Sequence, residues 1–150
     1  MDILYFYYHF KENGEFSNFY EAPFYDDNGL FFPTSEHYYQ YYKFTQTNLK
    51  VAKQIRTAKR PADAYRLSRQ FRDDVRIDWD TIKIDVMRRA IYYKFTQNPH
   101  LKEKLLLSDS RILAENSPRD YFWGLGMDKS GKNMLGKLLM ELRECLKGQQ

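Results

Sequence analysis

The chain has 150 residues, the usual size of one domain, so we expect a single domain over residues 1–150. A net charge of +4, from 24 basic and 20 acidic residues without a long run of either sign, suits a phosphate-bearing small molecule as well as a polymer. No apolar stretch approaches the roughly 18 residues of a membrane span, and no signal-like segment opens the chain. We therefore expect a cytoplasmic protein, with a nuclear location as the alternative.

The first third of the chain predicts a small antiparallel β element. Residues 3–10 are aromatic and β-prone, Asn13 and Gly14 form a turn signal, and residues 16–20 supply a second strand. A further turn at residues 26–29 precedes the apolar residues 30–32, and Pro33 ends the pattern. We expect one hairpin or a pair of hairpins here.

Six helices are predicted after Pro33, which makes the fold mainly α, within the α+β class. Apolar residues recur every three or four positions in each segment, and each begins with a capping residue or a proline. The signals for the helix starts are Thr34, Asn48, Pro61, Asp78 or Asp80, the Asn98–Pro99 pair, and residues 131–133.

Cysteine and histidine usage indicates neither a disulfide nor a metal. Cys145 is the single cysteine, and its place in an apolar helical pattern predicts a core thiol. His37 has no companion in metal-ligand spacing, because the other histidines are His9 and His100. We expect no metal and no cofactor.

Residues 34–44 are the most informative segment. At about 3.6 residues per turn, Glu36, Gln40 and Lys43 share one helical face, so a carboxylate, an amide and an amine line up. On composition alone, a solvated surface stripe is the commoner outcome. The surrounding Tyr and Phe residues favour a site instead, because desolvation and mutual attraction shift the pKa values of acidic and basic groups.

A second candidate segment surrounds Trp79. Arg66, Arg69 and Arg76 precede this tryptophan at the start of a predicted helix. Guanidinium groups bind phosphate in pairs of hydrogen bonds, and an indole ring stacks on bases. The alternative is that Trp79 anchors the helix start in the core while the arginines are solvated, and the residues alone favour that alternative.

The third candidate segment surrounds Asp120. This aspartate stands among aromatic residues and glycines, where it is either an activated carboxylate or, more commonly, the first residue of an Asx turn. Four glycines follow within thirteen positions, which predicts a loop whose backbone lies close to another group. They are Gly124, Gly126, Gly131 and Gly136.

Taken together, the three segments resemble the motifs of the YbiA-like, or NADAR, family, and the resemblance covers nearly the whole chain. The matching residues are Phe16-Ser17-Asn18-Phe19, Pro33-Thr34-Ser35-Glu36-His37-Tyr38 with Gln40 and Lys43-Phe44, Arg76 with Asp78-Trp79, Asp120, Trp123-Gly124, Gly126, Gly131-Lys132-Asn133, Leu135-Gly136, and residues 138–143. So many matches in the right order are far more specific than any one of them.

The resemblance implies a compact, mostly helical N-glycosidase that cleaves a ribosyl C1–N bond. Substrates in the family are phosphoribosylamino-pyrimidine intermediates of riboflavin synthesis and guanine carrying ADP-ribose, including ADP-ribosylated DNA or RNA. Glu36, Lys43 and Asp120 are the implied catalytic residues, with Lys83 as a second candidate amine. The implied substrate-binding residues are Asn18, Gln40, Arg66, Arg69, Arg76, Trp79, Trp123 and Gly124.

One departure from the family pattern adjoins the third segment. Arg119 stands where some relatives have Asn, and Tyr121 with Phe122 makes the loop bulkier, so the substrate preference is expected to differ.

Two mechanisms and two rival functions stay open at this stage. Either Glu36 or Asp120 stabilises an oxocarbenium-like C1 and directs water, or Lys43 captures C1 as a Schiff base, and we favour the second. The main rival is a module that binds ADP-ribose or a related nucleotide without turnover. The other is a structural or nucleic-acid adaptor, supported by charge and aromatic content alone.

Overall fold

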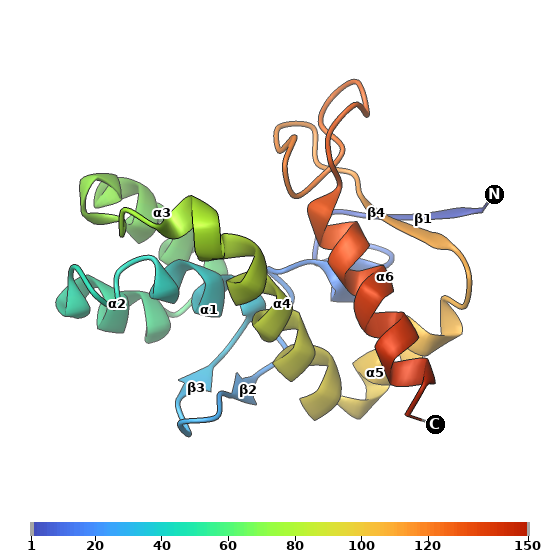
Figure 1. The fold of residues 1–150 in the computed structure, drawn as a ribbon, viewed down its shortest axis with the longest axis horizontal. Coiled ribbons are helices and arrows are strands. Elements are labelled where there is room, and N and C mark those ends of the chain that lie inside the picture. The colour runs from blue at the N-terminus through green and yellow to red at the C-terminus, as the bar shows by residue number, and fades with distance from the viewer. Residues whose placement is uncertain (1, 150) are drawn as a thin grey trace. The chain divides into compact units, whose positions relative to one another are not determined.

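The computed structural model describes residues 2–149, which divide into two compact units. The central unit comprises residues 21–98, and the terminal unit comprises residues 2–20 together with 99–149. Each unit is described by itself below, with element labels as in Figure 1. The expectation of a single domain stays a prediction.

The central unit consists of four helices and one small hairpin. Helices α1 (Ser35–Tyr42), α2 (Leu49–Arg56) and α3 (Pro61–Gln70) pack against one another, and α1 also packs on the long helix α4 (Trp79–Gln97). Strands β2 (Phe24–Tyr25) and β3 (Phe31–Phe32) pair antiparallel around the turn at residues 26–29. This is the hairpin that the turn signal predicted.

The predicted caps hold the helices of the central unit. The side chain of Thr34 accepts the backbone N–H of His37 at the start of α1, and the side chain of Asn48 accepts that of Val51 at the start of α2. Five residues form a buried core under these helices, namely Phe44, Val51, Ala52, Ile55 and Ala64. This core fixes the inner faces of α2 and α3.

The terminal unit joins segments from both ends of the chain. Strand β1 (Ile3–Phe6) pairs in parallel with β4 (Ile112–Glu115), in a register that sets Ile3 opposite Ile112. Helix α6 (Met134–Lys147) packs on β4 and on α5 (Pro99–Leu107). Two short 3-10 turns occur among the described residues, Gly14–Phe16 in this unit and Arg72–Asp74 in the central unit.

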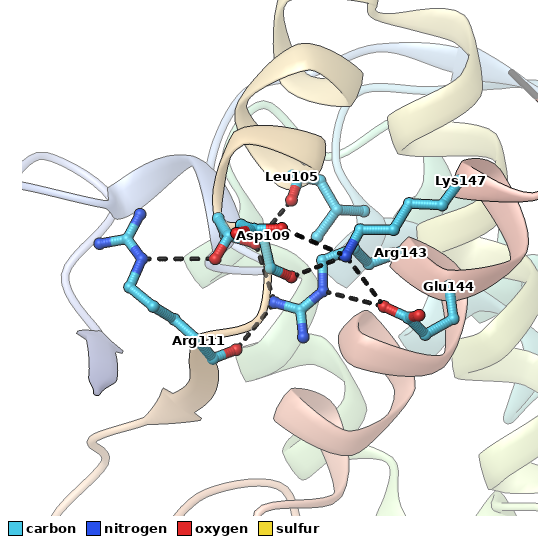
Figure 2. Close-up of polar contacts among 7 residues, drawn as sticks. Leu105, Asp109, Arg111, Arg143, Glu144 and Lys147 are labelled. Carbon is cyan, nitrogen blue, oxygen red and sulfur yellow. Dashed lines mark hydrogen bonds and ion pairs between the residues drawn. The ribbon is translucent and has the colours of Figure 1, made fainter. Parts of the chain in front are cut away.

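A buried arginine fastens the turn between α5 and β4 to α6, as Figure 2 shows. Arg143 Nη1 donates to Ser108 Oγ at 3.0 Å and to the carbonyl of Arg111 at 2.8 Å, while only 4% of the residue is exposed. Lys147 adds a bond to the carbonyl of Asp109 at 3.0 Å, where the backbone takes a positive φ of 54°. These contacts add to the turn's own backbone bonds, in which the N–H of Asp109 donates to the carbonyl of Leu106 and the N–H of Arg111 to that of Ser108, both at 3.0 Å.

The fold class is confirmed: among residues 2–149 there are six α-helices and two small two-stranded sheets. Two strand predictions were wrong. The strand at residues 3–10 is shorter and pairs in parallel with β4, a segment that the pattern did not predict as a strand. Residues 16–20 do not form a strand, because the chain enters a tight turn at Gly14, where an added Cβ would lie 2.3 Å from the carbonyl oxygen of His9.

The prediction for Cys145 was also wrong, because this thiol is exposed. Leu142 and Leu146 occupy the inward stripe of α6, and Cys145 is turned about 100° from Leu146 around the helix axis. Within the described residues, no helix combines the length and the apolar character that crossing a bilayer requires.

Candidate functional site

Helix α1 positions a buried carboxylate and a buried amide together. Glu36 is 7% exposed and Gln40 is 3% exposed, one turn further along the same face. Gln40 Nε2 donates to Glu36 Oε2 at 2.7 Å, so the amide orients the carboxylate. The solvated stripe that composition favoured is therefore not what forms here.

Lys43 stands at the C-terminal end of α1, within a cage of polar and aromatic groups. Its Nζ donates to the hydroxyl of Ser68 on α3 at 3.3 Å and lies 5.3 Å from the ring centre of Tyr39 and 5.7 Å from that of Trp79. The carbonyl of Lys43 accepts the backbone N–H of Arg76 at 2.9 Å, which anchors the backbone at this position. The amine is thus held by α1, α3 and the start of α4.

The surroundings of Lys43 lower the pKa of its amine. Burial lowers the pKa of the amine below its ordinary value, and the positive charges of Arg69 and Lys83 lower it further, while the charge of Glu36 opposes them. The influence of Glu36 on Lys43 also means that the two groups lie close enough to interact. A lysine with a lowered pKa supplies more of the neutral amine at a given pH, and the neutral amine is the nucleophilic form.

Trp79 is buried beside this amine. It is 8% exposed, and its ring meets Tyr39 edge to face with centroids 5.0 Å apart. The ring is buried at the start of α4, as the core alternative expected, and it also forms part of the wall around Lys43. Its role in stacking on a base stays a prediction.

The three arginines assigned to phosphate binding lie in different environments. Arg66 is exposed on α3 and pairs with Asp63 at 2.8 Å, and Arg69 is exposed with its guanidinium carbon 6.0 Å above the ring of Tyr65. Arg76 is half-buried, and its Nε and Nη2 donate to Asp78 at 2.6 and 3.0 Å. Of the three arginines, Arg69 is the one whose positive charge acts on the amine of Lys43.

Asp120 forms a turn in the terminal unit. Its Oδ1 accepts the backbone N–H groups of Phe122 at 2.9 Å and Trp123 at 2.8 Å, and its own N–H donates to Ser117 Oγ at 3.2 Å. This is the Asx turn that was expected as the commoner outcome. The turn fixes the orientation of the carboxylate, so a structural role and a chemical role remain compatible.

The loop after Asp120 is held by its backbone. The carbonyls of Phe122, Trp123 and Gly124 accept the N–H groups of Met134, Leu135 and Asn133 respectively, at 3.0 Å each, and so cover the start of α6. A Cβ on Gly124 would lie 2.9 Å from the carbonyl oxygen of Glu115, so only glycine fits there without a shift. Trp123 is half-buried and meets Phe122 edge to face at 4.8 Å.

Asn18, the remaining predicted binding residue, also belongs to the terminal unit. It is 8% exposed and lies directly after the Gly14–Phe16 turn. The predicted site residues therefore gather in two groups: Glu36, Gln40, Lys43 and Trp79 meet in the central unit, and Asp120, Trp123 and Gly124 meet in one loop of the terminal unit.

Two residues of the site escaped sequence reasoning. Ser68 is 3% exposed and accepts the hydrogen bond from Lys43, and the ring of Tyr39 lies beside that amine and packs on Trp79. Ser68 follows Ala64 by one turn on the buried face of α3, so a hydroxyl on an otherwise apolar stripe was the available signal. Tyr39 carried no such signal among so many aromatic residues.

The structure also shows the surroundings of His37, the histidine considered as a metal ligand, and of Lys83, the second candidate amine. His37 Nε2 lies 2.9 Å from the carbonyl of Ala58 and Nδ1 lies 2.7 Å from Thr34 Oγ1, so both ring nitrogens serve the fold. No three His, Cys, Asp or Glu side chains in residues 2–149 gather as metal ligands would. Lys83 pairs with Asp80 at 3.1 Å on α4, whereas the amine of Lys43 donates to a hydroxyl and has its pKa lowered by burial.

Comparison with known proteins places this chain in a family. A sequence model of the NADAR domain matches residues 5–147. The maize riboflavin biosynthesis protein PYRR is 42% identical over 159 residues, which cover 98% of this chain and 26% of the maize protein. N-glycosidase YbiA of Escherichia coli K12 is 41% identical over 144 residues, which cover 96% of this chain and 88% of that enzyme.

The fold comparison agrees with the sequence comparison. The NMR structure of E. coli YbiA matches with a TM-score of 0.90 and 40% sequence identity, covering 99% of this chain and 86% of that one. This chain thus spans most of the bacterial relative but only about a quarter of the length of the maize relative.

Proposed function

Because this chain belongs to the NADAR domain family, as its motifs predicted, we propose that it is an N-glycosidase that cleaves a ribosyl C1–N bond with Lys43 as the nucleophile. Relatives that carry the name N-glycosidase share about two fifths of its residues along nearly its whole length, which supports the reaction class. Family membership does not decide between the Schiff-base mechanism and direct hydrolysis. We therefore choose between them from the chemistry of the site.

The observation that carries the proposal is the environment of Lys43. Its amine is held by Ser68 and walled by Tyr39 and Trp79, and its lowered pKa makes the neutral form accessible. The charge of Glu36, which Gln40 orients, acts on this amine, and we assign Glu36 the role of proton donor in the same site. A glycosidase that used carboxylates alone has no need of such an amine.

The proposed reaction proceeds through a Schiff base. The ribose ring opens as the C1–N linkage becomes an imine, and the N–H proton of that linkage passes to the ring oxygen. Lys43 Nζ adds to C1, and the proton that Nζ loses passes to the base nitrogen. The bond from C1 to the base nitrogen then breaks, and that nitrogen takes up a proton delivered through Glu36. Water adds to the imine that remains between C1 and Nζ, which releases the sugar and restores the lysine.

Direct hydrolysis is the competing mechanism. In it, Glu36 or Asp120 stabilises positive charge at C1 and directs a water molecule, as paired carboxylates do in glycoside hydrolysis. Asp120 already accepts two backbone N–H groups at one oxygen, and this turn holds the carboxylate in one orientation. This route requires no covalent bond to the protein, and that difference separates the two.

The substrate is proposed from the family and from the residues around Lys43. ADP-ribosylated guanine and the phosphoribosylamino-pyrimidine intermediates both join a base nitrogen to a ribose C1 and both carry phosphate. The name of the maize relative supports the second class. Trp79 would contact the base, and Arg69 would meet the phosphate.

A trapping experiment tests the nucleophile. Borohydride added during turnover reduces an imine, so the wild-type protein is expected to gain the mass of one sugar moiety on the peptide that contains Lys43. Lys43→Arg is expected to lose both the label and the turnover, because a guanidinium stays charged at neutral pH. Lys50→Arg, at an exposed lysine on α2, is the matched control and should behave as wild type.

Three outcomes would revise the proposal in different ways. Retained activity in Lys43→Arg with no adduct on the wild type leaves direct hydrolysis. An adduct on Lys83 keeps the chemistry and moves the residue. Binding of ADP-ribosylated guanine or of the pyrimidine intermediate without any released sugar would make the chain a binding module and not an enzyme.

A further inference from the structure

The terminal unit contains a cavity that includes none of the proposed catalytic residues. The cavity has a volume of about 450 Å³. Its lining includes Tyr7, Tyr8, Asn116, Pro118, Met127 and Lys129. Tyr7 and Tyr8 directly follow strand β1, and Asn116 directly follows strand β4, so the cavity lies at the carboxyl ends of the two paired strands (Figure 1).

A row of aromatic rings extends from this cavity along the segment after β1. The ring centres of Tyr7 and Tyr8 lie 4.6 Å apart, and those of Tyr8 and Phe10 lie 5.3 Å apart. Tyr8 is 50% exposed, Phe10 is 69% exposed, and Met127 in the cavity wall is 73% exposed. Large apolar side chains gathered in this way at the surface indicate an interaction site. We call the cavity together with Phe10 the aromatic groove.

The polar side chains of the aromatic groove are available for a ligand. Four of them form no hydrogen bond or ion pair with another of residues 2–149, namely Tyr7, Tyr8, Asn116 and Lys129. A tyrosine hydroxyl, an asparagine amide and a lysine amine can each donate a hydrogen bond. The groove therefore favours a ligand that is rich in hydrogen-bond acceptors.

Two lysines place positive charge at the aromatic groove. Lys129 Nζ lies 4.8 Å from the ring centre of Tyr5, and Lys11 Nζ lies 5.5 Å from that of Tyr8. Neither amine pairs with a carboxylate in the part of the chain that the structure describes. A ligand with negative charge beside its apolar part would be attracted by both amines.

We propose that the aromatic groove docks a proline-rich segment of a partner protein, with acidic residues next to the prolines. A proline residue has a carbonyl acceptor and no backbone N–H, so a run of prolines matches a groove that offers donors. Such a run is already ordered as a polyproline II helix, which packs on aromatic-lined grooves at a low cost in entropy. Lys11 and Lys129 select the acidic residues.

Other occupants match the aromatic groove less well. A pocket for a small molecule buries most of the ligand, whereas Tyr8 and Met127 leave this one widely exposed. An extended peptide keeps its outer side in water and needs only one wall. A second copy of this chain cannot supply the segment, because the five prolines of the sequence are far apart from one another.

Fluorescence anisotropy of a labelled peptide, decaproline followed by three glutamates, tests the proposal. Tyr8→Ala should weaken binding about tenfold, because it removes the central ring of the row. Tyr8→Phe keeps the ring and loses the hydroxyl, so binding should weaken about threefold. Tyr92→Ala is the matched control, at a tyrosine of α4 that is 46% exposed, and should bind as the wild type does.

A second pair of variants tests the preference for acidic residues. Lys129→Glu should weaken binding of the acidic peptide about fivefold and strengthen binding of decaproline followed by three lysines. Lys102→Glu makes the same change of charge on α5 of the same unit, outside the groove, and should alter neither affinity. Tyr8→Phe and Lys129→Glu keep the test decisive if Tyr8→Ala lowers the stability of the fold.

Several results would each overturn the proposal. One is the absence of saturable binding of the acidic decaproline peptide at up to about 1 mM wild-type protein. Another is equal weakening by Tyr8→Ala and Tyr92→Ala. A glycine–serine peptide with the same three glutamates that binds as tightly would show that charge alone is responsible. Self-association that Tyr8→Ala abolishes, without binding of the proline peptide, would assign the groove to a second copy of this chain.

Discussion

The candidate functional residues of the two units make different kinds of contacts. In the central unit, Glu36, Gln40 and Lys43 are side chains on one regular helix, and their contacts are bonds between side chains. In the terminal unit, the carboxylate of Asp120 and the carbonyl of Gly124 accept backbone N–H groups, in a loop without regular structure. A substitution at the central-unit residues should mainly lower turnover. A substitution in the terminal-unit loop should mainly lower the stability of the fold.

This difference follows from the local sequence. A helix satisfies its own backbone, so its side chains are left for other partners. The loop at residues 120–133 must find partners for its backbone elsewhere, and it does so at Asp120, at the start of α6 and at the carbonyl of Glu115. Its glycines are there because other residues would collide.

The largest effect is expected on turnover, from a substitution of Glu36 in the central unit. Glu36→Gln keeps the size of the side chain but removes its charge and its ability to deliver a proton, so turnover should fall by about 10²- to 10⁴-fold. Thermal unfolding should stay close to that of the wild type. Turnover within about threefold of the wild type would remove Glu36 from the mechanism.

The next largest effect is expected on stability, from a substitution of Gly136 in the terminal unit, where α6 packs closely on the backbone of β4. In Gly136→Ala the new Cβ would lie 2.1 Å from the carbonyl oxygen of Leu113, so α6 must move away from β4, and we expect a loss of about 2–4 kcal/mol in urea unfolding. Lys137→Ala, at the next and exposed position of α6, should change stability by less than about 0.5 kcal/mol. Equal stability of the two variants would mean that α6 and β4 accommodate the methyl group.

Asp120 combines the two kinds of role, because its carboxylate forms a turn and is also a candidate catalytic group. Two substitutions separate these roles. Asp120→Asn keeps an oxygen for the N–H groups of Phe122 and Trp123, so stability should be retained, while turnover should fall about 100-fold if the charge is required. Asp120→Ala loses the acceptor as well, at a cost of about 1–3 kcal/mol. A fully active Asn variant would assign Asp120 to the turn alone.

The smallest effect concerns the pKa of Lys43. Its neutral form is the proposed nucleophile, so kcat should rise with pH through that pKa. The positive charge of Arg69 lowers the pKa, so Arg69→Gln should raise it and move the rising limb of the kcat profile to higher pH. Arg72→Gln removes a charge that does not act on Lys43 and should leave the limb in place; movement in both variants would point to net charge instead.

Helix periodicity and capping made much of the central unit predictable. Thr34 and Asn48 cap α1 and α2 as expected, and the spacing of Glu36, Gln40 and Lys43 predicted that they would gather. What spacing could not show is which buried hydroxyl or ring from another helix completes the cage. Ser68 and Tyr39 enter only through packing between helices.

The terminal unit was harder to predict because its partners are remote in the chain. Strand β4 has four residues and pairs with a strand about 110 positions earlier, and no local pattern records such a pairing. Cys145 shows a related limit: an apolar pattern identifies a helix but does not resolve residues at the edge of its stripe. The glycine cluster did predict a crowded loop, without showing what the backbone approaches.

The parallel pairing of β1 with β4 has a consequence for how the chain folds as it is synthesised. The central unit is contiguous, so all of its internal contacts become available once residue 98 has left the ribosome. Strand β1 emerges first but must wait for residues 112–115 before it has a partner in its sheet. Its aromatic residues are therefore exposed longest during translation, and closure of that long intervening segment is the step expected to set the rate at which the terminal unit folds.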